Sequence, residues 1–98
     1  METSTNLIFN MISTRIIKEQ ELIIGPLAWD EASKVDGLTI VDKKQYKVEL
    51  TGDPKEIIDR LVARYVRLFG KLSREVCKEA VGDLTAEIPA EQIPSSLQ

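Results

Sequence analysis

Residues 53–81 read DPKEIIDRLVARYVRLFGKLSREVCKEAV, and this stretch decides the fold expected for the chain. Pro54 suits the first position of a helix, and Asp53 before it can accept hydrogen bonds from the free amides of the first turn. Glu56 follows three residues after this cap, as in a capping box. Apolar residues then recur at helical spacing. The pattern predicts one amphipathic helix from Pro54 to about Val81.

The two sides of this predicted helix differ in chemistry. Cations recur at intervals of four and three residues, which a continuous helix gathers within an arc of about 80° and a length of about 27 Å. These six are Arg60, Arg64, Arg67, Lys71, Arg74 and Lys78. The opposite side is apolar and is expected to face a core; it comprises Ile58, Leu61, Val62, Tyr65, Leu68, Phe69, Leu72, Val76 and Ala80.

Gly70 lies in the middle of this predicted helix. A glycine inside a helix costs roughly 1 kcal/mol relative to alanine. Two alternatives therefore stay open: a continuous helix, or a break at Gly70 with Ser73 capping a second helix. The apolar pattern passes through Gly70 without a change of phase, which favours the continuous helix.

The N-terminal third predicts two helices. A helix capped by Ser4 or Thr5 and ending near Glu21 would bury a set of apolar residues and expose the polar ones between them. The set to be buried is Ile8, Phe9, Ile12, Ile16 and Ile17, and the exposed set is Asn10, Ser13, Thr14 and Lys18. The β-branched content also allows a strand at residues 22–24. After Gly25-Pro26, a short helix from Pro26 to about Lys34 would bury Leu27, Ala28, Ala32 and Trp29 and would stop at Asp36-Gly37.

Residues 38–51 change to a period of two. Tyr46, Val48 and Leu50 alternate with polar residues, and Leu38 and Ile40 do the same on a shorter scale. This alternation predicts two strands joined by a hairpin loop at residues 42–45. An isolated hairpin is marginal, so it must pack on the main helix or pair with the hairpin of a second subunit.

These elements predict a single small α/β domain of the α+β type over residues 1–84. Its order is α-α-β-β-α, with an antiparallel hairpin packed on a long amphipathic C-terminal helix. Residues 85–98 form a tail that contains proline and serine. Two prolines prevent a long helix there, and the tail either docks on the domain or is disordered.

The composition fits one globular domain. The chain has 98 residues, 43% of them hydrophobic, and a net charge of −3, which argues against a general nucleic-acid binder. The charge is unevenly placed, because residues 43–78 hold ten bases and five acids whereas residues 79–98 hold four acids and no base. No signal peptide and no apolar run of membrane-spanning length is present, so a cytoplasmic protein is expected.

The residues offer little for catalysis. The chain has one cysteine, Cys77, and no histidine, so neither a transition-metal site nor a nucleophile–base pair is expected. Cys77 lies between Arg74 and Lys78, which could make it reactive, but a small buried hydrophobe is favoured. Three acids that could attract Mg²⁺ or Ca²⁺ lack the spacing of an EF-hand and are expected to be solvated: Asp30, Glu31 and Asp36. No catalytic residue, metal, cofactor or enzymatic activity is predicted.

The function expected is that of a non-catalytic regulatory or adaptor module acting through protein–protein contacts, with a protein or a second copy of the chain as partner. The six cations from Arg60 to Lys78 are its candidate anion- or partner-binding residues, or else the solvated side of a helix. The alternative is a nucleic-acid-binding regulator that uses this basic ridge. No aromatic residue lies between the cations for base stacking, which counts against the alternative.

Overall fold

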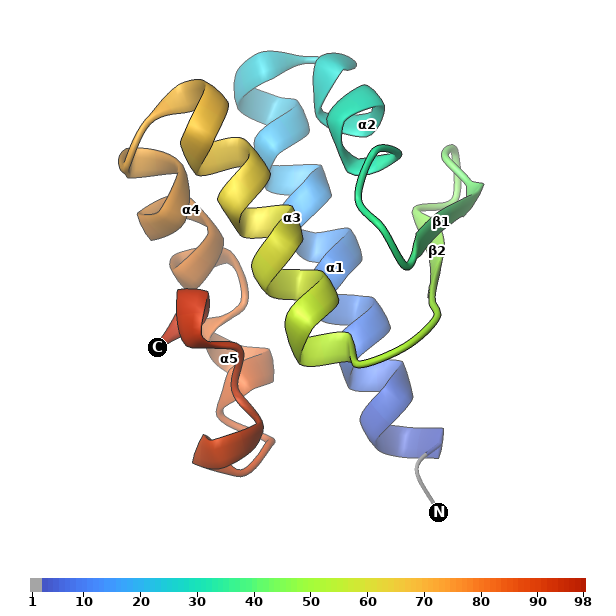
Figure 1. The fold of residues 1–98 in the computed structure, drawn as a ribbon, viewed down its shortest axis with the longest axis vertical. Helices are drawn as coiled ribbons and strands as arrows, with labels where there is room; N and C mark the ends of the chain where they lie inside the picture. Colours follow the sequence, from blue (N-terminus) through green and yellow to red (C-terminus); the bar gives the residue numbers. More distant parts are fainter. Residues whose placement is uncertain (1–2) are drawn as a thin grey trace.

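The computed structural model describes residues 3–98, with side chains from Leu7 onward. A short antiparallel hairpin lies at one edge of a group of helices (Figure 1). The elements are α1 (Thr3–Ile24), α2 (Leu27–Ala32), β1 (Leu38–Asp42), β2 (Lys47–Leu50), α3 (Pro54–Phe69), α4 (Leu72–Ala80), α5 (Gly82–Thr85) and two 3₁₀ turns, η1 (Ala90–Gln92) and η2 (Ser95–Leu97).

Helix α1 is the central element, because it contacts α2, β2, α3, α4 and α5. Its predicted apolar stripe is largely confirmed, since Phe9, Ile12, Ile16 and Ile17 are buried. Ser13 was expected to face water, yet it is buried, and its hydroxyl donates to the carbonyl oxygen of Phe9 at 3.0 Å. The helix continues past Glu21 to Ile24, so residues 22–24 form no strand.

The predicted hairpin is present. Strands β1 and β2 pair antiparallel, with Leu38 opposite Leu50 and Ile40 opposite Val48. The hairpin packs chiefly on α1 through β2, and not on the long helix as predicted. Gly37 has the positive φ that the sequence allowed for it, +89°, and a Cβ there would lie 2.8 Å from Cδ1 of Ile57. It does not stop the second helix, however, because α2 already ends at Ala32, with Ser33 as its C-cap.

Helix α3 begins as predicted. Pro54 is its first residue, and Oδ1 of Asp53 accepts a hydrogen bond from the amide of Lys55 at 3.0 Å. It ends at Phe69, because Gly70 has φ +94° and ψ +175°, a conformation outside any helix. Helix α4 starts again after Lys71, and Ser73 makes no cap. The continuous helix to Val81 is therefore wrong.

The small mixed α+β domain with a two-stranded antiparallel hairpin is confirmed, but the predicted order is not. Helices α3 and α4 lie in the middle of the chain, and short turns follow them to the C-terminus (Figure 1). The apolar side predicted for the long helix also divides at the break. Ile58, Leu61, Val62 and Tyr65 are buried, whereas Leu68, Phe69 and Leu72 are exposed.

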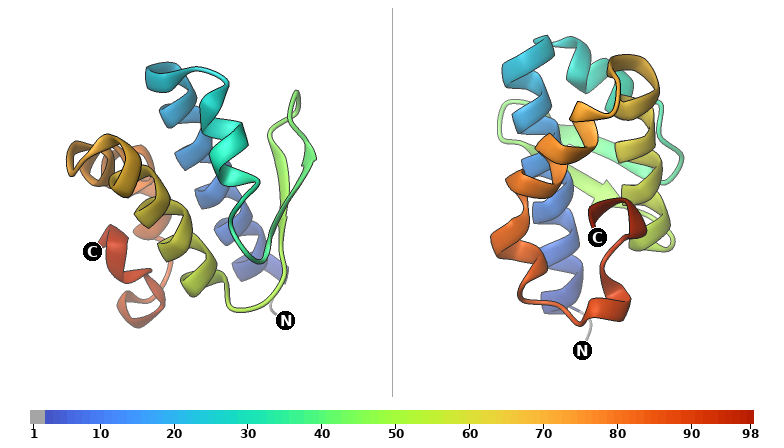
Figure 2. Two further views of the ribbon diagram at one scale, coloured as in Figure 1. Left: turned by 45° about the horizontal axis from the view of Figure 1, so that its top comes forward. Right: turned by 90° about the vertical axis from the view of Figure 1, so that its left-hand side faces the viewer.

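The C-terminal segment packs against α3 and α4 through η2 (Figure 2). Ile88, Pro94 and Leu97 are buried. The carboxylate of Asp59 accepts hydrogen bonds from the hydroxyl of Ser95 and from both the amide and the hydroxyl of Ser96. Of the two alternatives that the sequence left open for residues 85–98, the structure shows the docked one.

Candidate interaction surface

The six predicted site residues are divided between two helices. Arg60, Arg64 and Arg67 lie on α3 and line one hollow of about 370 Å³ together with Ala63 and Leu68. The other three belong to the next helix: Lys71 precedes its first turn, Arg74 lies within it, and Lys78 lies in its last turn. The break at Gly70 therefore replaces the single basic ridge with one group of three arginines and a separate group beyond the corner.

Contacts within the chain use three of the six cations. Nε of Arg64 lies 2.8 Å from Oε1 of Glu31, and Arg60 lies 3.4 Å from Glu56. Arg74 donates to the carbonyl oxygen of Ser96 at 2.9 Å. Within residues 3–98 as described, the side chains of the remaining three form no hydrogen bond or ion pair: Arg67, Lys71 and Lys78. The structure thus gives half of the predicted site residues a structural role.

The pair of Glu31 and Arg64 joins α2 to α3. Burial of the Glu31 carboxyl would raise its pKa, but the hydrogen bonds and positive charges of Arg64 and Lys34 together hold the pKa below its ordinary value. Glu31 is therefore ionised at neutral pH and satisfied by two cations. Because Arg64 is paired with Glu31, its charge is partly neutralised. The hollow lined by the three arginines therefore has less unpaired positive charge than their number suggests.

A cluster of exposed apolar side chains is the feature that the sequence did not predict. Six large residues at one end of the molecule have between 37% and 78% of their surface exposed. We call this cluster the apolar end; it comprises Leu22, Ile23, Leu27, Leu68, Phe69 and Leu72. Isolated exposed leucines are common on proteins, whereas six large apolar residues left exposed at two neighbouring helix corners are not.

Two contacts between distant parts of the chain hold the apolar end together. Nε2 of Gln20 donates to the carbonyl oxygen of Ser73 at 3.4 Å, which brings the last turns of α1 beside the start of α4. The pair of Arg64 and Glu31 does the same for α3 and α2. Leu68 follows Arg64 by one turn. The α1–α2 corner and the α3–α4 corner consequently lie at the same end of the molecule (Figures 1 and 2).

The hairpin is anchored to α1 and α2 by a small aromatic cluster. Oε2 of Glu21 accepts from Nε1 of Trp29 at 2.8 Å, and Oε1 accepts from the hydroxyl of Tyr46 at 3.1 Å. The two aromatic rings are 5.5 Å apart. Trp29 is buried, as predicted. These contacts hold Tyr46 at φ +55°, an uncommon conformation for a residue other than glycine.

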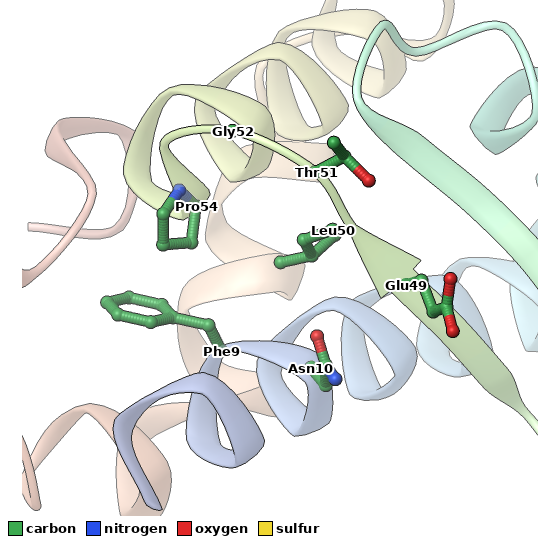
Figure 3. Close-up of a pocket in the computed structure, with 7 residues that line it drawn as sticks. All are labelled: Phe9, Asn10, Glu49, Leu50, Thr51, Gly52 and Pro54. Atoms are coloured by element: carbon green, nitrogen blue, oxygen red, sulfur yellow. The ribbon is translucent and has the colours of Figure 1, made fainter. Parts of the chain in front are cut away.

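Two further hollows lie beside α1 and the hairpin. One, of about 290 Å³, is lined by Phe9, Asn10, Glu49, Leu50, Thr51, Gly52 and Pro54 (Figure 3). Its single carboxylate, Glu49, points away from the aromatic side chain of Phe9 (Figure 3). A second lies between α1 and the hairpin and includes Leu7, Met11, Val41 and Tyr46. Both linings combine apolar side chains with hydroxyl groups and the carboxylate of Glu49.

Cys77 has the character of a core residue. It is fully buried, and burial raises the pKa of its thiol to about 11, only partly offset by a hydrogen bond from Gln20. Its neighbours in sequence, Arg74 and Lys78, do not make it acidic. The thiol is therefore protonated at neutral pH and shielded from reagents, which agrees with a structural role.

Across residues 3–98, no group of three or more potential metal ligands lies close enough to hold an ion. Nor does any helix in that range have the length and apolar character needed to cross a membrane. Comparisons with protein-family models, with curated proteins and with solved structures find no match.

The sequence does contain a signal for the apolar end. Gly25-Pro26 and Gly70 both interrupt helices, and each has large apolar residues on its two sides. A helix that stops at such a glycine cannot carry its apolar stripe into the core beyond that point. Large apolar residues on both sides of two helix-ending glycines could therefore have predicted the exposed apolar end.

Proposed function

We propose that this protein is a non-catalytic adaptor or regulatory module that acts in the cytoplasm by binding protein through the apolar end. One observation carries the proposal: six large apolar side chains, from Leu22 to Leu72, remain exposed at the two helix corners of a domain whose other large apolar residues are mostly buried. Such a surface gains free energy when a partner covers it, at roughly 25 cal/mol for each Å² of apolar area removed from water.

The charges beside the apolar end indicate the kind of partner. Leu68 belongs to both the apolar end and the arginine-lined hollow on α3. Arg67 and Lys71 are exposed on either side of Phe69 and Gly70. Positive charges at the rim of an apolar patch favour a partner surface that is apolar at its centre and acidic at its edge. A cytoplasmic location agrees with a chain whose only cysteine is a buried free thiol.

Nucleic-acid binding is the alternative function, and the three cations without a partner in the described chain are its support. Arg67, Lys71 and Lys78 could contact phosphates. The positive charge is, however, spread over two helices that diverge at Gly70, and Arg60, Arg64 and Arg74 already bind within the chain. A contiguous basic surface would serve this function better.

The proposal is tested by capture from a lysate of the source cells with the full chain as bait. Leu22→Ser/Leu72→Ser changes two of the most exposed members of the apolar end, while Leu7→Ser/Val41→Ser is a matched control at other exposed positions. A protein held by wild type and control but lost from the Leu22/Leu72 variant supports the proposal. Equal capture by all three baits would refute it.

A parallel titration decides the alternative. Wild type and Arg67→Glu/Lys71→Glu are titrated with duplex DNA and single-stranded RNA at two salt concentrations. Binding by phosphate contacts weakens steeply with salt and is lost in the charge-reversed variant. We expect no such salt-dependent binding. If it occurs, the nucleic-acid function replaces the proposed one.

A further inference from the structure

We infer that the partner covering the apolar end is a second copy of this chain, in a two-fold symmetric dimer. This inference rests on the proposed function, since it names the occupant of the surface on which that function depends. Charge is divided unequally between the two corners that form the apolar end, and this division favours a second copy as the occupant.

The two corners are alike in apolar content and opposite in charge. The α1–α2 corner contributes Leu22, Ile23 and Leu27, and the charges beside it are Lys18, Glu19 and the exposed Asp30, one more acid than base. The α3–α4 corner contributes Leu68, Phe69 and Leu72. Its flanking charges are all exposed and are mainly positive: Arg67, Lys71, Arg74 and Glu75. One corner is net negative and the other net positive.

This division makes the surface complementary to itself. In a two-fold symmetric interface, a contact between one region of the first subunit and a different region of the second is repeated with the subunits exchanged. Two different corners can therefore contact each other twice. The α1–α2 corner of one copy then packs on the α3–α4 corner of its partner. Leucine and isoleucine side chains meet at the centre, and Asp30 of each copy faces the side of the other that has Lys71. Pairing like corners would instead bring Arg67 and Lys71 against their own copies.

The free edge of the hairpin is a weaker place for self-association. The ladder between β1 and β2 is irregular between Ile40 and Asp42, and the turn that follows has Lys43 and Lys44 exposed. Bulges and lysines on an edge strand hinder pairing with another strand. The apolar end is formed by helices and has no strand edge of this kind.

The test is sedimentation equilibrium of the full chain over a wide range of concentration. We expect a mass approaching twice the 11.0 kDa of the chain at high concentration. Leu72→Glu should lower the association constant at least tenfold, while Leu7→Glu, equally disruptive in chemistry and exposed at the other end of α1, should leave it unchanged. Both leucines are exposed, so neither change removes a core residue.

A charge-reversal pair tests the arrangement of the corners. Asp30→Lys and Lys71→Glu should each weaken the dimer, and the double variant should recover most of the lost affinity because the pair is restored with opposite signs. A wild type that stays monomeric overturns the inference, as does a dimer indifferent to Leu72→Glu. A double variant weaker than either single variant also overturns the proposed arrangement.

The outcomes separate this inference from the proposed function. A monomer whose apolar end captures a different protein removes self-association and leaves the function intact. If the chain is monomeric and captures no protein through the apolar end, both the self-association and the proposed function are wrong. A monomer that instead sediments with vesicles of anionic phospholipid, and loses this with Leu72→Glu, assigns the surface to a membrane and overturns both.

Discussion

Nε of Arg64 lies 2.8 Å from Oε1 of Glu31, and this contact fixes α2 against α3 one turn before the exposed Leu68. The same carboxylate also accepts from Nζ of Lys34 at 3.2 Å. A cation that the sequence assigns to a binding surface thus serves to position the helices that form that surface. Several measurements can separate such structural roles from binding roles.

Replacing Arg64 by alanine should destabilise the protein more than replacing Arg67. Arg64→Ala leaves the carboxylate of Glu31 with only Lys34, whereas Arg67 has no partner among the described residues, so Arg67→Ala should change the free energy of unfolding by no more than ~0.5 kcal/mol. Urea denaturation measures both. Equal stability of the two variants would show that the Arg64–Glu31 pair contributes nothing.

The same pair predicts a pH dependence. The pKa of Glu31 is lower in the folded than in the unfolded chain, so its stabilising contribution is present at neutral pH and is lost as the pH falls through the acidic range below the ordinary glutamate pKa. In Glu31→Gln this part of the acid-induced loss should disappear. Unfolding free energies of wild type and variant, measured from neutral to acidic pH, should therefore converge as the pH falls.

Gly70→Ala should destabilise the protein by about 1–3 kcal/mol, the usual cost of holding a residue other than glycine in a sparsely populated backbone conformation. The cost is purely that of the backbone, because no atom lies within 4 Å of the added Cβ. Gly82→Ala is the matched control, since it also has open space around it and no positive φ. Thermal unfolding should show a lower midpoint for the first variant and an unchanged or higher one for the second. Equal midpoints would contradict the strain at Gly70.

Cys77 should make the protein less stable at alkaline pH. Burial raises the pKa of its thiol from 9.0 to about 11. Between these values the unfolded chain loses the proton while the folded chain retains it, so stability falls as the pH rises. The slope of unfolding free energy against pH in this range should be shallower in Cys77→Ala than in wild type. Parallel slopes would show that the thiol is not shielded.

Asp59→Ala should release the C-terminal segment without unfolding the domain. The carboxylate of Asp59 accepts from the amide of Ser96 at 3.0 Å and from two serine hydroxyls. Losing hydrogen bonds to a charged group typically costs about 1–3 kcal/mol. Hydrogen exchange should therefore accelerate at the amide of Ser96 while the amides of α1 keep their protection. Glu87→Ala, at an exposed position in the same part of the chain, should change neither.

Local signals were sufficient to predict the start of α3, the hairpin and the positive φ of Gly37. Each of these features depends on residues that are adjacent in sequence, such as Asp53 and Pro54 at the start of α3. The backbone itself places such residues close together. The break at Gly70 was the less favoured of two alternatives, because the apolar period continues across it and period alone cannot distinguish one helix from two. Its cause is tertiary: α4 folds back so that Cys77 reaches the core and Gln20 reaches the carbonyl of Ser73.

The candidate site depended on that break. With a continuous helix, Leu68 and Leu72 belong to a core and the cations form one ridge. With a corner at Gly70, the leucines become exposed and Arg74 turns towards Ser96. Tyr46 escaped prediction for a similar reason, because its positive φ is held by contacts with Trp29 and Glu21 that are distant in sequence.

The most direct test of the account is site-specific photo-crosslinking of the full chain in its native cells. A photoreactive amino acid is placed at Leu22 or Leu72 in the apolar end, and at Leu7, which is also exposed, as a control. We expect discrete crosslinks to protein, the chain itself among them, from positions 22 and 72 and none from position 7. Crosslinks to nucleic acid alone, or the same products from all three positions, would contradict the claim that the apolar end is a protein-contact surface.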